Sequence, residues 1–336
     1  MSQMRDIAHI MPPSEPGDVC LHAGTLSHGS GYLFIPTWIT GGINELLVGF
    51  EAEKVIDALE VSKVSFAFLA PSQLAALCRA KNAEGRNFDK LKALWIAGAP
   101  ISPETALLSR KVFGERVYPT FNQTEVALAV VMTPQEWFSE LEGSKPLEAA
   151  GRVFAWAQLE IRDENNLPLG IGETGEIAIR AEGQMDGYLG PPELSKDKIV
   201  DGWILTGDIG YLDKNGFLYI VDRKGATIIS GGYNIYPAEL ERVIGSLPGV
   251  LEVAVVPIPD ERWGETPLAV CVVKPETDVT EQLISDVCKQ RLGSYKKPGR
   301  IIIQRERLPM TPVGKIDRRA IKEPYWAGLG KRVAGT

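Results

Sequence analysis

Apolar and polar residues follow two different periods in the first 150 residues, which predicts helices and buried strands in alternation. A mainly apolar run at 64–69 has the length of a strand covered on both faces, and the segment before it has the spacing of an amphipathic helix. The elements expected here are a helix at 53–61, a strand at 64–69, a helix beginning at Pro71, a strand at 94–97 and a helix from Ser102 as N-cap to about Phe113. Strand, turn and helix in repetition predict a mainly parallel sheet covered by helices.

The pattern changes near residue 151, where short apolar runs are separated by turn sequences such as Asn165-Asn166 and Asp186-Gly187. The strands expected here are 159–162, 175–180, 203–205 and 217–222. Short strands joined by tight turns are typical of antiparallel pairing. Residues 151–222 are therefore predicted to form a small antiparallel β-barrel or distorted sheet.

Helix and strand alternate again after residue 224. The elements expected are a helix at 237–247, strands at 250–258 and 269–274, a helix at 280–291 and a strand at 300–304. About 100 residues suffice for a separate domain. The predicted organisation is a partial α/β subdomain at 1–150, the barrel-like subdomain at 151–222, a hinge at 223–225 and a mobile α+β domain at 226–336.

Composition narrows the classes of function. The net charge is -7, which argues against a nucleic-acid partner, and no apolar stretch approaches the ~20 residues of a membrane span. The four cysteines are scattered without a Cys-x-x-Cys pair, and His9, His22 and His28 lack metal-site spacing. These features predict a soluble, cytoplasmic protein whose thiols are free.

Four segments combine residue types suited to ligand chemistry. They are 121–125 (Phe-Asn-Gln-Thr-Glu), 206–208 (Thr-Gly-Asp), 222–237 with its Gly231-Gly232 pair, and the lysine-bearing loop 309–318. Each also has a structural interpretation. Thr-Gly-Asp is commonly a turn, Arg223 with Asp208 or Asp222 can be a surface ion pair, the glycines can serve a bend, and Lys315 can be solvated. Their order along the chain favours a shared functional role.

That order resembles the adenylate-forming superfamily of acyl- and aryl-CoA synthetases, peptide-synthetase adenylation domains and luciferase. The resemblance runs from about Gly24 to Glu323. The loop 309–318 fits the pattern Pro-x-Thr-x-x-Gly-Lys-Ile-x-Arg, and 26–31 is similar to the acyl-pocket segment around a histidine, here His28. Segments 260–265 and 295–298 are typical of the acyl-CoA synthetase branch.

The resemblance implies an AMP-forming acid–CoA ligase that uses ATP, Mg²⁺ and coenzyme A. A carboxylic acid would attack the α-phosphate of ATP, and a thiol would then attack the acyl-adenylate and release AMP. The implied contacts are Gly98, Ala99, Pro100 and Phe121 with adenine, Thr124 with the α-phosphate, Glu125 with Mg²⁺, and Asp208 with Arg223 at the ribose.

Catalysis is implied for the lysine of the 309–318 loop. Lys315 would stabilise the charge that develops at the α-phosphorus. The C-terminal domain would then rotate about Gly225, so that Ser230, Gly231 and Gly232 replace Lys315 for the thiol step. His28 would line the acyl site, or alternatively pack as a structural histidine.

Two departures from the family pattern matter. Asn122 occupies a position that is usually glycine, which predicts less space beside the acyl group or phosphate. The Ser/Thr/Gly-rich phosphate loop is expected upstream of Met1, so an apolar face would be left for a second copy of the chain or another partner to cover.

Other activities follow from the same residues. A thioester-forming half-enzyme would accept a preformed acyl-adenylate, and a non-catalytic module would bind AMP alone. A peptide-synthetase adenylation domain fits less well, since no carrier domain follows. Four aromatic residues near the acyl segment are either core residues or a sign of an apolar, cyclic or aromatic acid; they are Tyr32, Phe34, Trp38 and Trp95.

Overall fold

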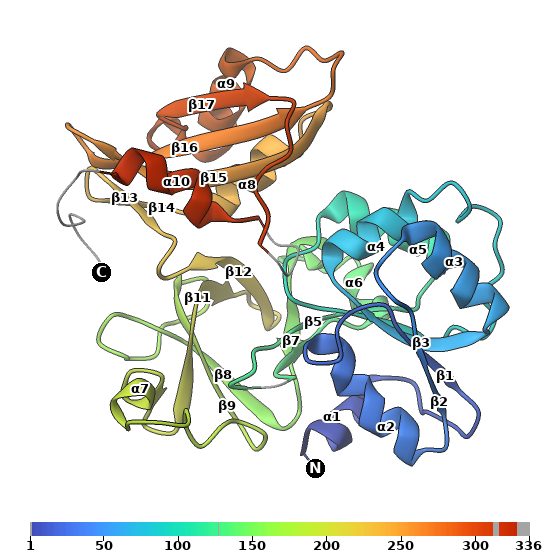
Figure 1. Ribbon diagram of the computed structural model, residues 1–336. Helices are drawn as coiled ribbons and strands as arrows, with labels where there is room; N and C mark the ends of the chain where they lie inside the picture. The colour runs from blue at the N-terminus through green and yellow to red at the C-terminus, as the bar shows by residue number, and fades with distance from the viewer. Residues whose placement is uncertain (1, 127, 312–315, 328–336) are drawn as a thin grey trace. The chain divides into compact units, whose positions relative to one another are not determined.

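The computed structural model describes residues 2–126, 128–311 and 316–327. The chain divides into two compact units, which are described one at a time (Figure 1). The larger unit comprises Met1–Thr206 and Gly210–Ile220, and the smaller unit comprises Gly207–Ile209 and Val221–Thr336.

Five parallel strands form one half of the sheet in the larger unit. Their spatial order is β2 (Ile43–Leu46), β1 (Val19–His22), β3 (Val64–Leu69), β4 (Ala93–Ile96) and β5 (Val117–Phe121). The strand predicted at 64–69 is confirmed residue for residue, and every residue in it is buried. Parallel strands covered on both faces are nearly continuous apolar runs, which is why this strand could be predicted from the sequence.

The two faces of these strands are covered by different helices. Leu69 and Ile96 pack in one core with α3 (Ala52–Val61), α4 (Pro71–Cys78) and α5 (Pro103–Phe113). Phe68 and Trp95 pack in a second core with residues of α1 (Ser2–Ile10). The predicted cap of α5 is confirmed, because the Ser102 hydroxyl accepts a hydrogen bond from the Thr105 N–H at 3.2 Å. The parallel sheet with helices is therefore confirmed.

Antiparallel strands continue this sheet beyond β5. The spatial order runs through β6 (Val130–Val131), β7 (Gly151–Val153), β12 (Phe217–Arg223), β11 (Trp203–Leu212), β9 (Gly175–Ala181) and β8 (Ala157–Arg162). Their shared core includes Ile161, Ile177 and Leu218. The four strands predicted between 151 and 222 are all present, and β11 extends seven residues beyond the predicted end at 205.

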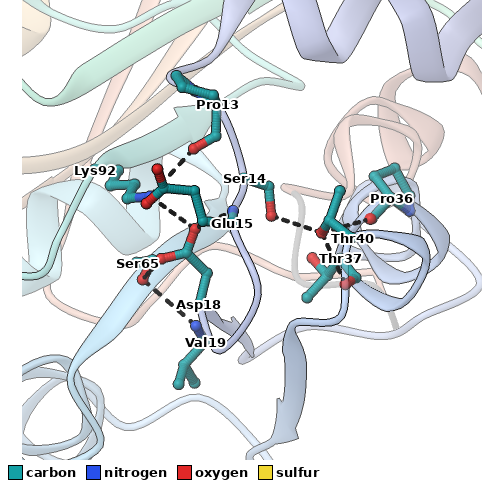
Figure 2. A network of polar contacts seen from close by, with 10 residues as sticks. All are labelled: Pro13, Ser14, Glu15, Asp18, Val19, Pro36, Thr37, Thr40, Ser65 and Lys92. Atoms are coloured by element: carbon teal, nitrogen blue, oxygen red, sulfur yellow. Dashed lines mark hydrogen bonds and ion pairs between the residues drawn. The ribbon is translucent and has the colours of Figure 1, made fainter.

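A polar network anchors the N-terminal segment to the parallel strands (Figure 2). The Lys92 ammonium donates to Asp18 at 2.8 Å and to Glu15 at 3.0 Å, and the Ser65 hydroxyl donates to the other Asp18 oxygen at 2.8 Å. Burial by itself raises the pKa of Asp18, but the hydrogen bonds from Lys92, Glu15 N–H and Ser65 outweigh it and hold the pKa below its ordinary value. Asp18 is therefore ionised at neutral pH.

The smaller unit is an α+β sandwich. The long hairpin β15 (Val250–Asp260) and β16 (Gly264–Val273) is flanked by β17 (Arg300–Gln304), which runs parallel to β16. One face of β15 and β16 packs against α8 (Pro237–Gly245) and α9 (Glu281–Leu292), and the other against α10 (Arg318–Trp326). The strand predicted at 300–304 is confirmed, and the Thr280 side chain caps α9 by accepting from Leu283 N–H at 3.2 Å.

Short elements complete the fold. They are η1 (Gly29–Leu33), α2 (Phe34–Ile39), α6 (Pro134–Trp137), η2 (Pro146–Glu148), α7 (Glu193–Lys196), β10 (Ile199–Val200), β13 (Ile228–Ser230), β14 (Tyr233–Ile235) and η3 (Ser294–Lys296). Within the described ranges, every helix is too short or too polar to traverse a bilayer.

Candidate functional site

Two of the sequence-predicted segments follow neighbouring parallel strands. Gly98, Ala99 and Pro100 come two residues after the end of β4, and the 121–125 segment begins at the last residue of β5. Because β4 and β5 are paired in parallel, their carboxyl ends meet at the same edge of the sheet. Ligands bind at such edges in open α/β sheets. The structure thus brings these two segments together within the larger unit.

The main chain of the 98–100 segment is open to close approach by a ligand. Gly98 has φ +98°, and a Cβ built there would meet nothing within 4 Å. All three residues are exposed. A side chain at Gly98 would be excluded by its backbone conformation and not by crowding. The segment therefore offers open main chain at the sheet edge.

The 121–125 segment turns away from β5 with its polar groups in defined places. Phe121 is half-buried against the antiparallel core, and Thr124 is exposed. The Gln123 amide donates to the Thr206 carbonyl at 2.9 Å, and Lys198 Nζ donates to the same carbonyl at 3.1 Å. These contacts fix the middle of the segment to the start of the Thr-Gly-Asp sequence. Asn122, the unusual residue, is half-buried.

Glu125 has a partner that the sequence did not indicate. The Tyr188 hydroxyl donates to Glu125 Oε1 at 2.6 Å. This hydrogen bond to a carboxylate, with a smaller contribution from burial, raises the pKa of Tyr188 to about 12, so the phenol stays protonated at neutral pH. In this region the sequence predicted only the Asp186-Gly187 turn, which precedes Tyr188. Lys198 was missed as well, since an isolated lysine carries no signal.

The segment around His28 is tightly packed, although the His28 side chain is exposed. A Cβ at Gly29 would lie 2.1 Å from the Phe68 ring, and one at Gly31 would lie 1.9 Å from the Leu26 carbonyl. The glycines of this segment are therefore required by close packing. The buried histidine is His22, whose ring nitrogens lie 3.0 Å from Ser30 Oγ and 2.7 Å from Asn44 Oδ1.

The aromatic residues near this segment divide between core and surface. Trp95 is fully buried and its indole N–H donates to Thr120 Oγ1 at 2.6 Å, whereas Trp38 is 70% exposed. Tyr32 packs against Trp95 with ring centroids 5.9 Å apart. Trp95 is thus an ordinary core residue, and Trp38 lies on the surface.

Asp208 and Arg223 meet in the smaller unit. Asp208 lies in β11 with 5% of its surface exposed, and its Oδ1 accepts from Arg223 Nε at 3.1 Å. The Arg223 side chain is itself 75% exposed. The adjacent carboxylate of Asp222 accepts from Ala238 N–H at 3.0 Å, in the first turn of α8. The two aspartates therefore make different contacts. Asp222 accepts a hydrogen bond from the first turn of a helix, whereas Asp208 accepts one from the Arg223 guanidinium.

The glycine pair forms the turn of a two-residue hairpin between β13 and β14. Ser230 pairs with Tyr233, and Gly231 and Gly232 have φ +57° and +84°, the positive values of a type I′ turn. The Gly231 N–H donates to the Trp263 carbonyl at 2.9 Å. A Cβ at Gly231 would lie 2.6 Å from the Trp263 ring, while one at Gly232 would meet nothing within 4 Å. Trp263 thus supports one side of the hairpin.

Lys315 lies outside the described residues. The described residues near it are well connected: Met310 and Ile316 form an antiparallel bridge, and the Asp317 N–H donates to the Pro309 carbonyl at 2.7 Å. Arg318 donates to both oxygens of Glu241, at 2.9 and 2.7 Å. The described residues on both sides of 312–315 are thereby attached to the smaller unit.

The carboxylate and hydroxyl oxygens of Glu125 and Thr124 suit Mg²⁺, which binds through one or two carboxylates together with substrate phosphates. Across the described parts of the chain, there is no cluster of three or more His, Cys, Asp or Glu side chains placed to hold a metal ion. A metal held by one carboxylate and a phosphorylated ligand is consistent with both observations.

Comparison with known proteins defines the class. A parallel α/β sheet extended by antiparallel strands, followed by a smaller α+β unit, also occurs in the amide bond synthetase McbA from Marinactinospora thermotolerans, with a TM-score of 0.88 and 29% identity over 96% of this chain and 66% of that one. It occurs too in o-succinylbenzoate CoA synthetase from Bacillus subtilis in complex with its acyl-adenylate intermediate, with a TM-score of 0.84 and 27% identity over 99% of this chain and 65% of that one.

Residues 1–189 match the family model for AMP-binding enzymes, and residues 239–315 match the C-terminal domain of AMP-binding enzymes. The chain belongs to the AMP-binding enzyme family. It is 32% identical to a medium/long-chain-fatty-acid–CoA ligase of Mycobacterium tuberculosis over 92% of this chain and 54% of that protein. It is 35% identical to 2-succinylbenzoate–CoA ligase of Listeria monocytogenes over 92% of this chain and 62% of that protein. The chain therefore spans a little over half the length of these relatives.

Proposed function

We propose that this protein acts in AMP-forming acid–CoA ligation. A carboxylate oxygen attacks the α-phosphorus of ATP and the bond to the bridging oxygen of the β-phosphate breaks, giving an acyl-adenylate and pyrophosphate. The CoA thiol then loses its proton and its sulfur attacks the acyl carbon; the acyl–oxygen bond breaks and AMP leaves. The observation that supports this most directly is the placement of 98–100 and 121–125 at the same edge of the parallel strands, in a chain of this family.

The proposed roles in the larger unit follow from that edge. Gly98, Ala99 and Pro100 line adenine and Phe121 stacks on it, since exposed main chain and an aromatic face suit a flat base. The Thr124 hydroxyl donates to the α-phosphate, and Glu125 holds Mg²⁺, which neutralises phosphate charge when bound. His28 borders the acyl group. Asn122 narrows the space beside the acyl group or the phosphate.

The proposed roles in the smaller unit concern the ribose and the two chemical steps. Asp208 accepts hydrogen bonds from the ribose hydroxyls while Arg223 orients its carboxylate. Lys315 stabilises the charge on the α-phosphorus. Ser230, Gly231 and Gly232 serve the thiol step, after a rotation about 223–225 that Gly225 permits.

We propose a fatty or aromatic carboxylic acid as the substrate, because the two curated relatives carry fatty acid and 2-succinylbenzoate in their names. We also propose a cytoplasmic location. All four cysteines are buried free thiols, which suits a reducing compartment.

The N-terminal edge of the larger unit supports a proposal about assembly. In the described chain β2 is an edge strand, and it and the neighbouring helix α2 expose large apolar side chains: Ile35, Trp38, Ile39, Ile43 and Leu46. Exposed apolar side chains beside an unpaired strand edge favour association. We propose that a second copy of this chain covers this edge.

A pair of assays with CoA and a panel of fatty and aromatic acids tests the proposed function. One assay supplies ATP and Mg²⁺ and measures AMP and acyl-CoA; the other supplies synthetic acyl-adenylates. Acyl-CoA in both assays supports the full ligase. Product from the adenylates alone replaces it with a thioester-forming half-enzyme. Folded protein that binds AMP but yields no product in either assay leaves a non-catalytic AMP-binding module and contradicts the proposal.

A further inference from the structure

Tyr188 forms a short side-chain hydrogen bond with Glu125. Its hydroxyl lies 2.6 Å from Glu125 Oε1, within the range of charge-assisted O–H···O⁻ hydrogen bonds. Such bonds are about twice as strong as neutral ones. None of the roles assigned above uses this tyrosine.

Backbone hydrogen bonds bring the two segments that make this contact together. The Met185 N–H donates to the Glu125 carbonyl at 2.9 Å, and Val126 and Gln184 form an antiparallel bridge. The chain that carries Tyr188 therefore runs beside the segment that carries Glu125. The two side chains meet although they are 63 residues apart in the sequence.

The backbone of Tyr188 is also held by a hydrogen bond. Its N–H donates to Ser195 Oγ, at the end of a short helix, at 2.8 Å. The preceding Gly187 has φ +154°, and a Cβ there would come within 3.1 Å of the same Ser195 oxygen. The backbone on both sides of this peptide bond thus lies close to Ser195, and the hydrogen bond restrains the main chain that carries the phenol.

We propose that Tyr188 is a positioning residue for the metal ligand, and that its hydrogen bond holds the Glu125 carboxylate in place before Mg²⁺ and the nucleotide arrive. The inference rests on the role proposed above for Glu125. A glutamate side chain loses rotamer freedom when it binds a cation, and a ligand fixed beforehand avoids that loss. A carboxylate has about four lone-pair sites, and the Tyr188 hydroxyl occupies one of them.

The test is binding without turnover. Tyr188→Phe removes only the hydroxyl. Calorimetric titration with ATP, in the absence of acid and CoA, is carried out at graded Mg²⁺ concentrations, and titration with AMP is carried out without metal. We expect the Mg²⁺ concentration that gives half of the gain in ATP affinity to rise about tenfold in Tyr188→Phe. AMP affinity should stay unchanged. Leu189→Ala, which truncates the fully exposed neighbour, is the matched control and should alter neither.

Glu125→Gln separates this inference from the proposed function. If Glu125→Gln abolishes the gain in ATP affinity that Mg²⁺ gives, while Tyr188→Phe leaves the half-maximal Mg²⁺ concentration unchanged or lowers it, the role of Tyr188 is overturned. The role of Glu125 then stands. If Mg²⁺ dependence is unaltered in both variants, the metal role of Glu125 fails and the inference fails with it. Equal loss of AMP and ATP affinity in Tyr188→Phe would also overturn the inference, since the hydroxyl would then support the loop and not the metal.

Discussion

Asp208 shows how one buried side chain can be tested for a ligand role. Asn has the same size as Asp but lacks the charge and one acceptor oxygen, so Asp208→Asn weakens both the Arg223 contact and the proposed ribose contact. We expect AMP to bind about tenfold more weakly, because hydrogen bonds to charged groups are worth about 1.5–3 kcal/mol. Calorimetry with AMP measures the change.

Two controls accompany this variant: a modified nucleotide and a second substitution. 2′,3′-Dideoxy-AMP lacks the hydroxyls, so the variant and the parent protein should bind it alike. Asp201→Asn alters an exposed turn residue before the same strand and should bind AMP normally. A similar loss of affinity for both nucleotides would show that Asp208 acts on the fold and not on ribose.

At the scale of a single element, the β13–β14 hairpin provides a matched pair of variants. Gly231→Ala and Gly232→Ala both place a Cβ at positive φ, which costs about 1–2 kcal/mol. Only the Cβ at 231 also meets the Trp263 ring. We therefore expect Gly231→Ala to lower the free energy of unfolding by about 1 kcal/mol more than Gly232→Ala. Chemical denaturation measures this, and hydrogen exchange at residue 231 reports the bond to the Trp263 carbonyl. Equal effects would show that the ring moves away without cost.

The network in Figure 2 makes the anchoring of the N-terminal segment dependent on pH. The pKa of Asp18 is lowered on folding, so its contribution to stability is complete above its unfolded value of about 3.9 and is lost as pH falls through the lower folded value. The pKa of Lys92 is raised: burial lowers it, but the hydrogen bonds to Asp18 and Glu15 outweigh this. That contribution is present below about pH 10.4 and is lost at higher pH.

We expect Asp18→Asn to lower the free energy of unfolding by about 1.5–3 kcal/mol at pH 7, and by less near pH 3. Urea denaturation at both pH values measures the difference. Glu15→Gln is the matched control, because Glu15 bonds the same lysine with a side chain that is 70% exposed; its effect should stay below about 1 kcal/mol. An Asp18→Asn effect that is equal at both pH values would contradict the assigned role of its charge.

At the scale of the whole molecule, the proposed self-association rests on the apolar edge formed by α2 and β2. Trp38 and Ile39 are 70% and 64% exposed. Replacing both with Gln removes apolar area from the proposed contact, so the average molar mass in light scattering after gel filtration should fall towards that of one chain. Ile171→Gln changes a similarly exposed residue in a distant turn and should leave the mass unchanged. A monomeric parent protein would contradict the proposed self-association.

The sequence by itself determined the elements whose signals are local. The strands at 64–69 and 300–304 and the Ser102 cap were predicted correctly, because apolar runs and N-cap hydroxyls act within a few residues. The family resemblance was likewise carried by short contiguous motifs. Such features do not depend on what the rest of the chain does.

Only the tertiary structure decided which distant residues meet. The full length of β11, the hairpin around Gly231 and the pairing of Tyr188 with Glu125 all depend on strand neighbours that are far away in the sequence. His22 with Ser30 and Asn44 is a further case, since no spacing rule relates the three. The physical reason is that strand pairing and buried hydrogen bonds are satisfied between elements, and a one-dimensional pattern records which residues can pair but not with which partner.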